Sequence, residues 1–374
     1  MKVLVTGAFG NVGRSTIKAL AEGGITISVL ETDTADNRRL APRLSRRLGL
    51  PGSQAISATF FGDVRDPGLV ARAVAGQDAI IHLAAIIPPE ADRQPALARS
   101  INIEGTATLI EAARKQAVAR GGSGSGSGSV SVSGSGGGGG GGGSDGGSDG
   151  GAEGPQLPRF VLASSIAAYG DRLRDFWIRT SDPLVPSPGD EYGQTKVEAE
   201  ALVRASGLPF SILRLTYIVW RKKLRRDPLM FHMPLSTRIE ICHTEDTGRA
   251  FAAAVVKDEA LGRTFDIGGG ESCRTNYRDY LDAMFRLFGL GGFGSVPEGA
   301  FATSGFHCGW FADSDEAEKV LGFRRKTLAD YYVEVAEEAG WKRLAATLFR
   351  PLVRASLAWK SPFLRRRQAV RIRA

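Results

Sequence analysis

The stretch "VTGAFGNVGR", residues 5–14, follows the short run "MKVL" and places Gly7, Gly10 and Gly13 three residues apart. Glycine at such positions permits a tight turn, close approach of the backbone to a pyrophosphate and packing of a helix on a strand. The amides at the start of the following helix would face the phosphates. The stretch therefore predicts a strand, a phosphate-binding turn and a helix, which together open a dinucleotide-binding fold.

A second apolar run, "ITISVLE", ends at Glu31, 18 residues after Gly13. A carboxylate at this place accepts the ribose hydroxyls of adenosine and disfavours a 2′-phosphate, so we expect NAD as the cofactor. Asp33 is the next candidate for the ribose contact. Arg38 and Arg39 follow closely and keep NADP as the alternative.

Short runs of consecutive apolar residues alternate with helical segments along the chain. The candidate strands lie at 2–7, 25–31, 78–85, 159–165 and 210–215, and the candidate helices at 11–23, 67–77, 102–116 and 193–207. Strands that are apolar throughout and alternate with helices predict a parallel sheet covered on both faces. We therefore expect an α/β fold with a doubly wound parallel Rossmann sheet over residues 1–215. Residues 216–340 would supply a small C-terminal substrate-binding cap, interleaved with the last Rossmann elements.

Composition excludes several other classes of protein. No basic leader precedes an apolar run at the start, and no stretch of about 18 apolar residues occurs, so we expect neither a signal peptide nor a membrane span. The three cysteines and four histidines show no metal-ligand spacing, so we expect no metal, no disulfide framework and a cytoplasmic location. We also expect no nucleic-acid partner, since the body carries no basic patch to match the tail.

Two segments depart from the globular pattern. Residues 121–154 are rich in Gly and Ser, which predicts a flexible surface loop inserted into the Rossmann domain. The tail, residues 341–374, holds ten Lys and Arg and no Asp or Glu, so it accounts for the net charge of +8. Its arginines alternate with Leu, Phe, Trp and Val, which suits peripheral contact with an anionic inner membrane surface. The alternative is a docked C-terminal helix with a solvated basic end.

The order of these motifs resembles that of an extended short-chain dehydrogenase/reductase of the NAD-dependent epimerase/dehydratase type, from residue 1 to about residue 335. The motifs that carry the resemblance are "TGAFGNVG" (6–13), "GDVRD" (62–66), "HLAA" (82–85), "NIEGT" (102–106), "SSIAAYGD" (164–171), "YGQTK" (192–196), "ICHTEDTGRAF" (241–251) and "FDIGGGES" (265–272).

The resemblance implies a set of cofactor contacts. Asp63 would meet the adenine amino group with Val64 beside it, and His82, Ala84 and Ala85 would line the cofactor after the fourth strand. Asn102 is either a catalytic residue or an amide that caps a helix or ties a strand. The full set of expected cofactor residues is Gly7, Ala8, Phe9, Gly10, Asn11, Val12, Gly13, Glu31, Asp63, Val64, Ala84, Ala85, Asn102 and Lys196.

The family's catalytic hydroxyl lies four residues before the Tyr of its "YG" step, which selects Ser165. Tyr192 and Lys196 stand at i and i+4 and therefore share one helix face. A nearby ammonium and the positive nicotinamide ring would favour the phenolate of Tyr192. We expect Tyr192 to take the hydroxyl proton, Ser165 to hydrogen-bond the developing oxyanion and Lys196 to hold the nicotinamide ribose.

The substrate is less determined. The cluster Arg221–Arg226 and Arg238 are candidates to grip a diphosphate, and Tyr169 is a third candidate substrate contact. We expect a secondary alcohol on a nucleotide-sugar, and epimerisation or dehydrogenation more than dehydration, because Ile166 and Ala167 stand where dehydratases of this type carry Asp-Glu. The alternative is an NAD(P)-dependent dehydrogenase or reductase of a small or lipophilic alcohol or ketone.

Two further hypotheses concern assembly and activity. The family often dimerises through the helix after Asn102 and the helix that carries Tyr192, so a homodimer is expected by resemblance. A cofactor-binding scaffold that has lost catalysis is a third interpretation, against which the presence of Ser165, Tyr192 and Lys196 argues.

Overall fold

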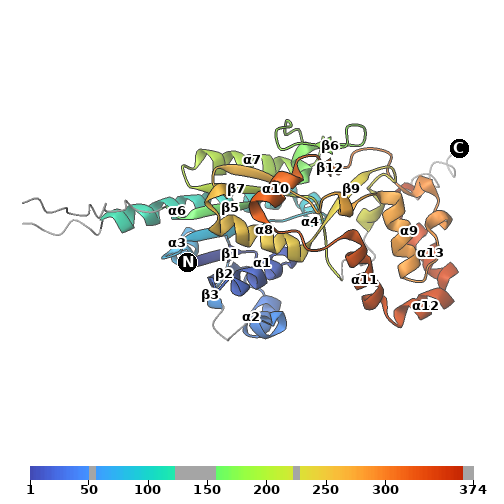
Figure 1. Ribbon diagram of the computed structural model, residues 1–374, viewed down its shortest axis with the longest axis horizontal. Helices are drawn as coiled ribbons and strands as arrows, with labels where there is room; N and C mark the ends of the chain where they lie inside the picture. The colour runs from blue at the N-terminus through green and yellow to red at the C-terminus, as the bar shows by residue number, and fades with distance from the viewer. Residues whose placement is uncertain (50–55, 123–156, 222–227, 365–374) are drawn as a thin grey trace, which may run out of the picture.

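The structure is a computed structural model that describes residues 1–49, 56–122, 157–221 and 228–364 (Figure 1). The predicted flexible insert falls almost wholly outside these ranges, as do Lys222–Arg226 of the basic cluster and the last ten residues. Within the described part, no helix is long and apolar enough to cross a bilayer.

A parallel sheet of seven strands forms the centre of the described chain, in the order β10-β7-β5-β4-β1-β2-β3. Every neighbouring pair in it is parallel. Its strands are β1 (Lys2–Thr6), β2 (Thr26–Glu31), β3 (Ile56–Phe61), β4 (Ala79–His82), β5 (Arg159–Ser165), β7 (Phe210–Leu215) and β10 (Arg263–Ile267). The chain winds outward from β1 in both directions, which confirms the predicted doubly wound Rossmann sheet.

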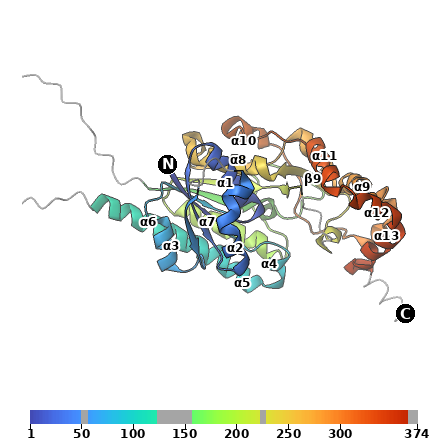
Figure 2. The same cartoon turned by 90° about the horizontal axis from the view of Figure 1, so that it is seen from below.

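Helices cover both faces of this sheet (Figure 2). One face carries α1 (Asn11–Glu22), α2 (Ala35–Leu48), α8 (Thr244–Val256) and α10 (Ser314–Leu321). The other carries α3 (Pro67–Val74), α6 (Gly105–Gly122) and α7 (Glu191–Ala205). Alternate residues of β1 supply the two cores, because Val3 and Val5 pack with α1 and α8 whereas Leu4 packs with α3 and α6. Such two-sided burial explains the unalternated apolar strands.

The direction of strand addition reverses between β1 and β4, and ligands bind outside the carboxyl ends of strands at such a point. Gly7 follows β1 with φ +65°, and a Cβ there would lie 2.7 Å from the Ala84 amide nitrogen. Only glycine therefore lets the first turn approach the end of β4. Between β4 and α6 the chain forms the short helices α4 (Glu90–Arg93) and α5 (Pro95–Arg99) and a π-helical turn, Ser100–Glu104.

A second apolar core lies beyond the carboxyl edge of the sheet and forms the cap. It is built on a small sheet in the order β11-β9-β8, and a two-stranded sheet of β12 and β6 lies beside it. The elements are β6 (Trp177–Ile178), β8 (Tyr217–Val219), β9 (Arg238–His243), β11 (Arg274–Asn276), β12 (Trp310–Phe311), α9 (Tyr277–Leu287) and α11 (Leu328–Ala339). Its role in substrate binding stays a prediction.

The tail forms two short helices, α12 (Lys342–Leu348) and α13 (Arg350–Trp359), beside α9 and α11 (Figure 1). Leu357 is buried in the cap core, and Val353 and Phe363 pack against it. The described part of the tail is therefore docked on the cap, as one of the two alternatives predicted.

Candidate functional site

A cavity of about 1420 Å³ runs from the glycine-rich turn, past the carboxyl ends of β4 and β5, into the cap. Its sheet end is lined by the residues expected to bind a cofactor. Its cap end is lined largely by aromatic and apolar side chains, among them Tyr217, Trp220, Met230, Tyr280, Phe306 and Phe363. The cavity thus joins the two halves of the molecule.

The glycine-rich turn shapes the sheet end of the cavity. Gly7, Gly10, Asn11, Val12 and Gly13 line it. A Cβ on Gly13 would lie 2.4 Å from the Gly7 carbonyl oxygen, so the turn and the first helix are in backbone contact there. Ala8 and Phe9 are buried behind the turn and do not line the cavity. Three of the five lining residues of the turn are glycines, so much of its surface there is backbone, which fits a pyrophosphate.

The acidic residue at the end of β2 faces the same end of the cavity. Glu31 accepts a hydrogen bond of 2.8 Å from the Phe9 amide, so it also ties the turn to β2. Asp33 lines the cavity too, and it holds Arg38 through contacts of 2.5 and 2.8 Å. The Arg38 guanidinium is thus paired with a carboxylate of the chain itself.

Asp63, Val64, Ala84 and Ala85 line the cavity as expected. The Asp63 carboxylate is bound by the Arg65 guanidinium at 2.5 Å, which lowers the pKa of that carboxyl. His82, in contrast, does not line the cavity. It is buried and bonds Thr6 at 2.7 Å and Thr106 at 3.0 Å, so it ties β4 to β1 and α6.

Ser165, Tyr192 and Lys196 meet in the middle of the cavity. β5 ends at Ser165, and α7 carries the other two on one face, with Asp190 as its N-cap. The Lys196 ammonium donates to the Ala163 carbonyl at 2.8 Å and lies 5.6 Å from the centre of the Tyr192 ring. The three side chains predicted as catalytic are therefore adjacent.

Burial sets the acidity of this group. It raises the pKa of Tyr192 to about 12, although a hydrogen bond with Ser165 acts in the opposite direction. It also lowers the pKa of Lys196 to about 8, with the Glu200 carboxylate opposing the shift. The pKa of Tyr192 thus shifts in the direction opposite to that expected from a neighbouring ammonium, because burial penalises the charged phenolate more.

Asn102 lies in the π-helical turn, and its side-chain amide both accepts and donates hydrogen bonds within the protein. It accepts from the Ile86 amide at 2.8 Å and donates to the Ile86 carbonyl at 3.1 Å and to Thr195 at 3.0 Å. It therefore ties the loop after β4 to the catalytic helix α7. Asn102 does not line the cavity, so its expected contact with the cofactor stays a prediction.

The three residues expected to bind substrate lie outside the cavity lining. Tyr169 is buried, and its hydroxyl donates to Asp266 at 2.8 Å and accepts from Arg214 at 2.6 Å. Arg221 is paired with Glu337 of α11 at 3.1 Å. The Arg238 guanidinium lies over the rings of Phe176 and Trp310, at 5.5 and 5.7 Å from their centres. Each side chain thus has a structural partner.

The cap end holds titratable residues that sequence reasoning missed, namely Asp92, Asp190, His232 and His307. His307 Nδ1 lies 3.2 Å from an Asp190 carboxylate oxygen and so links the cap to the start of α7. Burial opposes ionisation of Asp190, but hydrogen bonds from His307 and the Gly193 amide outweigh it and lower its pKa. Burial and the charge of Asp190 raise the pKa of Asp92. Only the fold brings these four distant positions together.

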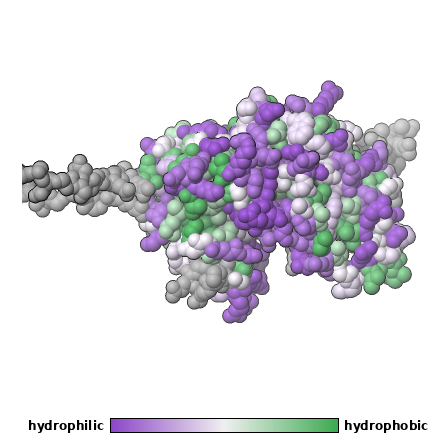
Figure 3. All heavy atoms as spheres, in the orientation of Figure 1, coloured by the Kyte–Doolittle hydropathy of each residue, from purple (hydrophilic) through white to green (hydrophobic). Residues whose placement is uncertain are grey.

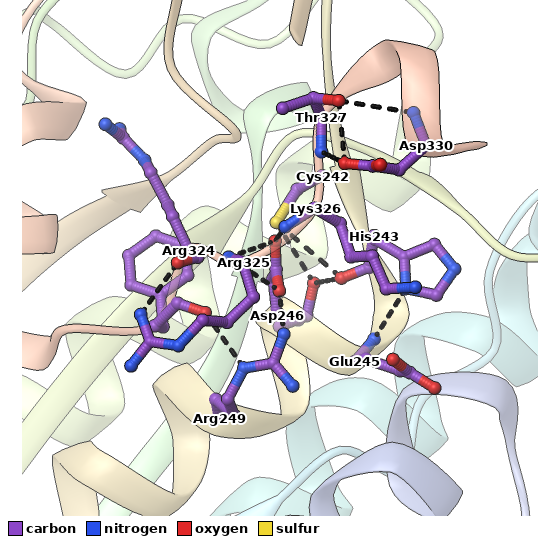
Figure 4. A network of polar contacts seen from close by, with 12 residues as sticks. Cys242, His243, Glu245, Asp246, Arg249, Arg324, Arg325, Lys326, Thr327 and Asp330 are labelled. Carbon is purple, nitrogen blue, oxygen red and sulfur yellow. Dashed lines mark hydrogen bonds and ion pairs between the residues drawn. The ribbon is translucent and has the colours of Figure 1, made fainter. Parts of the chain in front are cut away.

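Asp246 forms a separate anchor near the cap (Figure 4). Its buried carboxylate accepts from the amides of Arg325 at 3.1 Å and Lys326 at 3.0 Å and from the Arg249 guanidinium. It therefore fastens α8 to the segment that leads into α11, as an anchor and not a catalyst. The described residues contain no cluster of His, Cys, Asp and Glu that could hold a metal.

Comparison with known proteins adds the following. The model of the NAD dependent epimerase/dehydratase family matches residues 3–219. The dTDP-glucose 4,6-dehydratase of Mycolicibacterium smegmatis is 24% identical over 379 residues, covering 94% of this chain and 96% of that protein. The UDP-glucose-4-epimerase from Stenotrophomonas maltophila, solved with NAD and formylated UDP-arabinopyranose, superposes with a TM-score of 0.66 at 18% identity, covering 93% of this chain and 99% of that one. The UDP-glucuronic acid 4-epimerase from Bacillus cereus, solved with UDP-glucuronic acid and NAD, gives 0.64 at 18% identity, covering 91% and 99%.

Proposed function

Since the chain belongs to the NAD-dependent epimerase/dehydratase family, we propose that it oxidises a secondary alcohol, with NAD bound in the cavity and Tyr192 as the base. The observation that carries this proposal is the position of Ser165, Tyr192 and Lys196 in the same cavity as the glycine-rich turn. A cofactor on the turn and a substrate in the cap would meet at these side chains.

The residues at the sheet end suit NAD. The turn offers backbone amides for the pyrophosphate, and Glu31 and Asp63 offer carboxylates for the ribose and the adenine amino group. The Lys196 ammonium is available for the nicotinamide ribose. When bound, NAD supplies a hydride acceptor and the positive charge of its oxidised ring.

Tyr192 must lose its proton to act as a base, and its pKa of about 12 opposes that. Two groups of the chain act in the useful direction, the Ser165 hydroxyl through its hydrogen bond and the Lys196 ammonium through its charge. The phenolate then takes the proton of the substrate hydroxyl, and Ser165 hydrogen-bonds the oxygen as its carbon becomes a carbonyl.

A nucleotide-sugar is the first candidate substrate. Solved enzymes of similar fold carry UDP-sugars beside NAD, and the cavity exceeds the ~300–1,000 Å³ of a single-ligand pocket. Epimerisation or dehydrogenation is favoured over dehydration. Ile166 and Ala167 are buried apolar residues after Ser165, so no carboxyl is available there as an acid or base.

The lining of the cap end favours a second candidate, a lipophilic alcohol or ketone. Among the described residues that line the cavity, only Lys196, His232 and His307 can carry positive charge. A diphosphate is usually held by arginine, and no described arginine lines the cavity. Trp220 and Met230 both line the cavity, and the basic residues 222, 223, 225 and 226 lie between them in the sequence. Whether these basic residues bind the substrate distinguishes the two candidates.

A thermal-shift panel with NAD present tests these proposals. UDP-, dTDP- and GDP-sugars are compared with free nucleotides and with apolar alcohols, on the natural chain and on a variant in which the four basic residues become serine. A ligand at ~100 times its Kd stabilises by roughly 2.7 kcal/mol. A shift with one nucleotide-sugar that the variant loses supports the first candidate. A shift only with apolar alcohols, equal in both proteins, supports the second. No stabilisation by NAD itself contradicts the proposed function.

A further inference from the structure

Helices α12 and α13 turn apolar side chains to the outside. Trp341, Leu344 and Leu348 recur at helical spacing along one side of α12, and Leu352 and Trp359 do so on α13. All five side chains are between 69% and 76% exposed. Apolar atoms gather over α12 at the lower right of Figure 3. We call these five residues the C-terminal apolar face.

The opposite side of the two helices is fixed to the cap by polar groups. Arg350 Nε donates to the Gly289 carbonyl at 3.2 Å, and Arg354 Nη2 donates to the Gly292 carbonyl at 2.9 Å. Thr347 also donates to the Gly289 carbonyl, at 3.1 Å. A surface helix normally points its apolar stripe at the core and its charges at water. Here Arg350 and Arg354 face the body beside the buried Leu357, while the five large apolar side chains face outward, so the protein holds this apolar surface in place.

Five large exposed side chains on successive helices are more than the scattered apolar residues of an ordinary surface. The charge around them identifies the partner. Lys342 and Arg343 stand between Trp341 and Leu344 in the sequence, and residues 342–374 contain ten Lys and Arg without any Asp or Glu. Five of these arginines follow Leu364, where the described chain ends. Trp, Leu and basic residues together are typical of segments that lie in the interface of an anionic bilayer.

A second copy of the chain fits this surface poorly. An isologous dimer through the C-terminal apolar face would bring the two basic tails together, and like charges in contact repel. A bilayer with anionic headgroups accepts both the apolar side chains and the charge. We propose that the C-terminal apolar face docks the protein on an anionic lipid surface, to which the net positive charge of residues 342–374 attracts it. This proposal stands independently of the reaction proposed above.

The test is co-sedimentation of the full chain with vesicles of phosphatidylglycerol and phosphatidylcholine, and with vesicles of phosphatidylcholine alone. The natural chain is expected to bind the anionic vesicles at least about tenfold more tightly at low salt, and to lose much of that preference at 1 M salt, where the Debye length is ~3 Å. The double variant Leu344→Gln/Leu348→Gln is expected to bind the anionic vesicles at least about tenfold more weakly. Its matched control is Val185→Gln/Val256→Gln, which removes two exposed valines elsewhere.

The controls separate docking from folding and from self-association. Both double variants should unfold at the same temperature as the natural chain, because the replaced side chains are exposed. A second variant, Arg365→Gln/Arg366→Gln/Arg367→Gln, leaves the helices intact and should weaken only the binding to anionic vesicles. Equal vesicle binding by the leucine and valine variants overturns the proposal. So does a natural chain that ignores anionic vesicles, or one that forms a dimer which the leucine changes dissociate while lipid binding stays unchanged.

Discussion

Replacement of Gly13 by alanine tests whether the glycine-rich turn is shaped by backbone contact. The new Cβ would lie 2.4 Å from the Gly7 carbonyl oxygen and 2.6 Å from both the carbonyl carbon and the oxygen of Ala8. These neighbours are backbone, so they cannot rotate away, and such overpacking costs about 1–3 kcal/mol. Alanine recovers up to about 1 kcal/mol of helix propensity because Gly13 lies in α1. Because three backbone atoms lie within 2.6 Å, we expect the clash to exceed that gain, with a net loss of about 1–3 kcal/mol and a displaced turn.

The matched change is Gly10→Ala in the same turn, where the nearest atom to a Cβ is the Gly7 carbonyl oxygen at 3.4 Å. Thermal unfolding and NAD titration calorimetry are measured on both variants. Gly13→Ala should lower the melting temperature by several degrees and weaken the binding of NAD. If the pyrophosphate lies against the turn, Gly10→Ala should weaken the binding of NAD and leave the melting temperature unchanged. A Gly13→Ala protein with unchanged melting temperature and NAD affinity would refute this reasoning.

Three further predictions concern stability. Arg214→Leu removes the buried guanidinium that lies 2.8 Å from the buried Glu200 carboxylate and leaves that charge with only the Ser164 hydroxyl and the more exposed Arg204. The change should cost about 3–5 kcal/mol in urea unfolding at pH 7, and a loss below 1 kcal/mol would contradict it. Asp246→Ala leaves the amides of Arg325 and Lys326 without their hydrogen-bond acceptor and should cost about 2–3 kcal/mol in the same assay. An unchanged unfolding midpoint would contradict the role of Asp246 as an anchor. Burial and the Lys196 charge lower the pKa of His82 to about 3 from its ordinary 6.5, so below pH 6.5 the unfolded chain takes up a proton that the folded chain refuses. The free energy of unfolding should therefore fall by up to about 1.4 kcal/mol per pH unit between pH 6.5 and 3, and His82→Gln should flatten that slope.

Local patterns were enough to predict most of the central sheet. β5 and β7 have the predicted bounds, because runs such as "RFVLASS" and "FSILRL" are buried on both faces. Two strands of the sheet were missed for physical reasons. β3 alternates exposed and partly buried residues at the sheet edge. β10 carries Asp266, a buried carboxyl group that accepts a hydrogen bond from Tyr169. Neither strand has the continuous apolar run that a central strand shows.

The candidate site divides in the same way. The glycine turn, Ser165, Tyr192 and Lys196 could be predicted because their spacing within strands and helices fixes their direction, and the family that they indicated is confirmed. Contacts made across the chain could not be predicted in this way. The pairing of His307 with Asp190 joins residues more than a hundred positions apart, and Arg238 is held by two aromatic rings that no local pattern brings near it.

The most direct test of the account compares NAD-dependent turnover by the natural chain and by Tyr192→Phe, on the substrate that the thermal-shift panel identifies. Tyr192 is proposed as the base, and general acid–base catalysis contributes about 10²- to 10⁴-fold. Turnover should fall by that factor while NAD affinity, measured by titration, stays within about twofold. A Tyr192→Phe protein that turns over substrate at the natural rate would contradict the proposed role of Tyr192 as the base. A variant whose NAD affinity falls by the same factor as its turnover would contradict it too, and would indicate that Tyr192 supports the cofactor site.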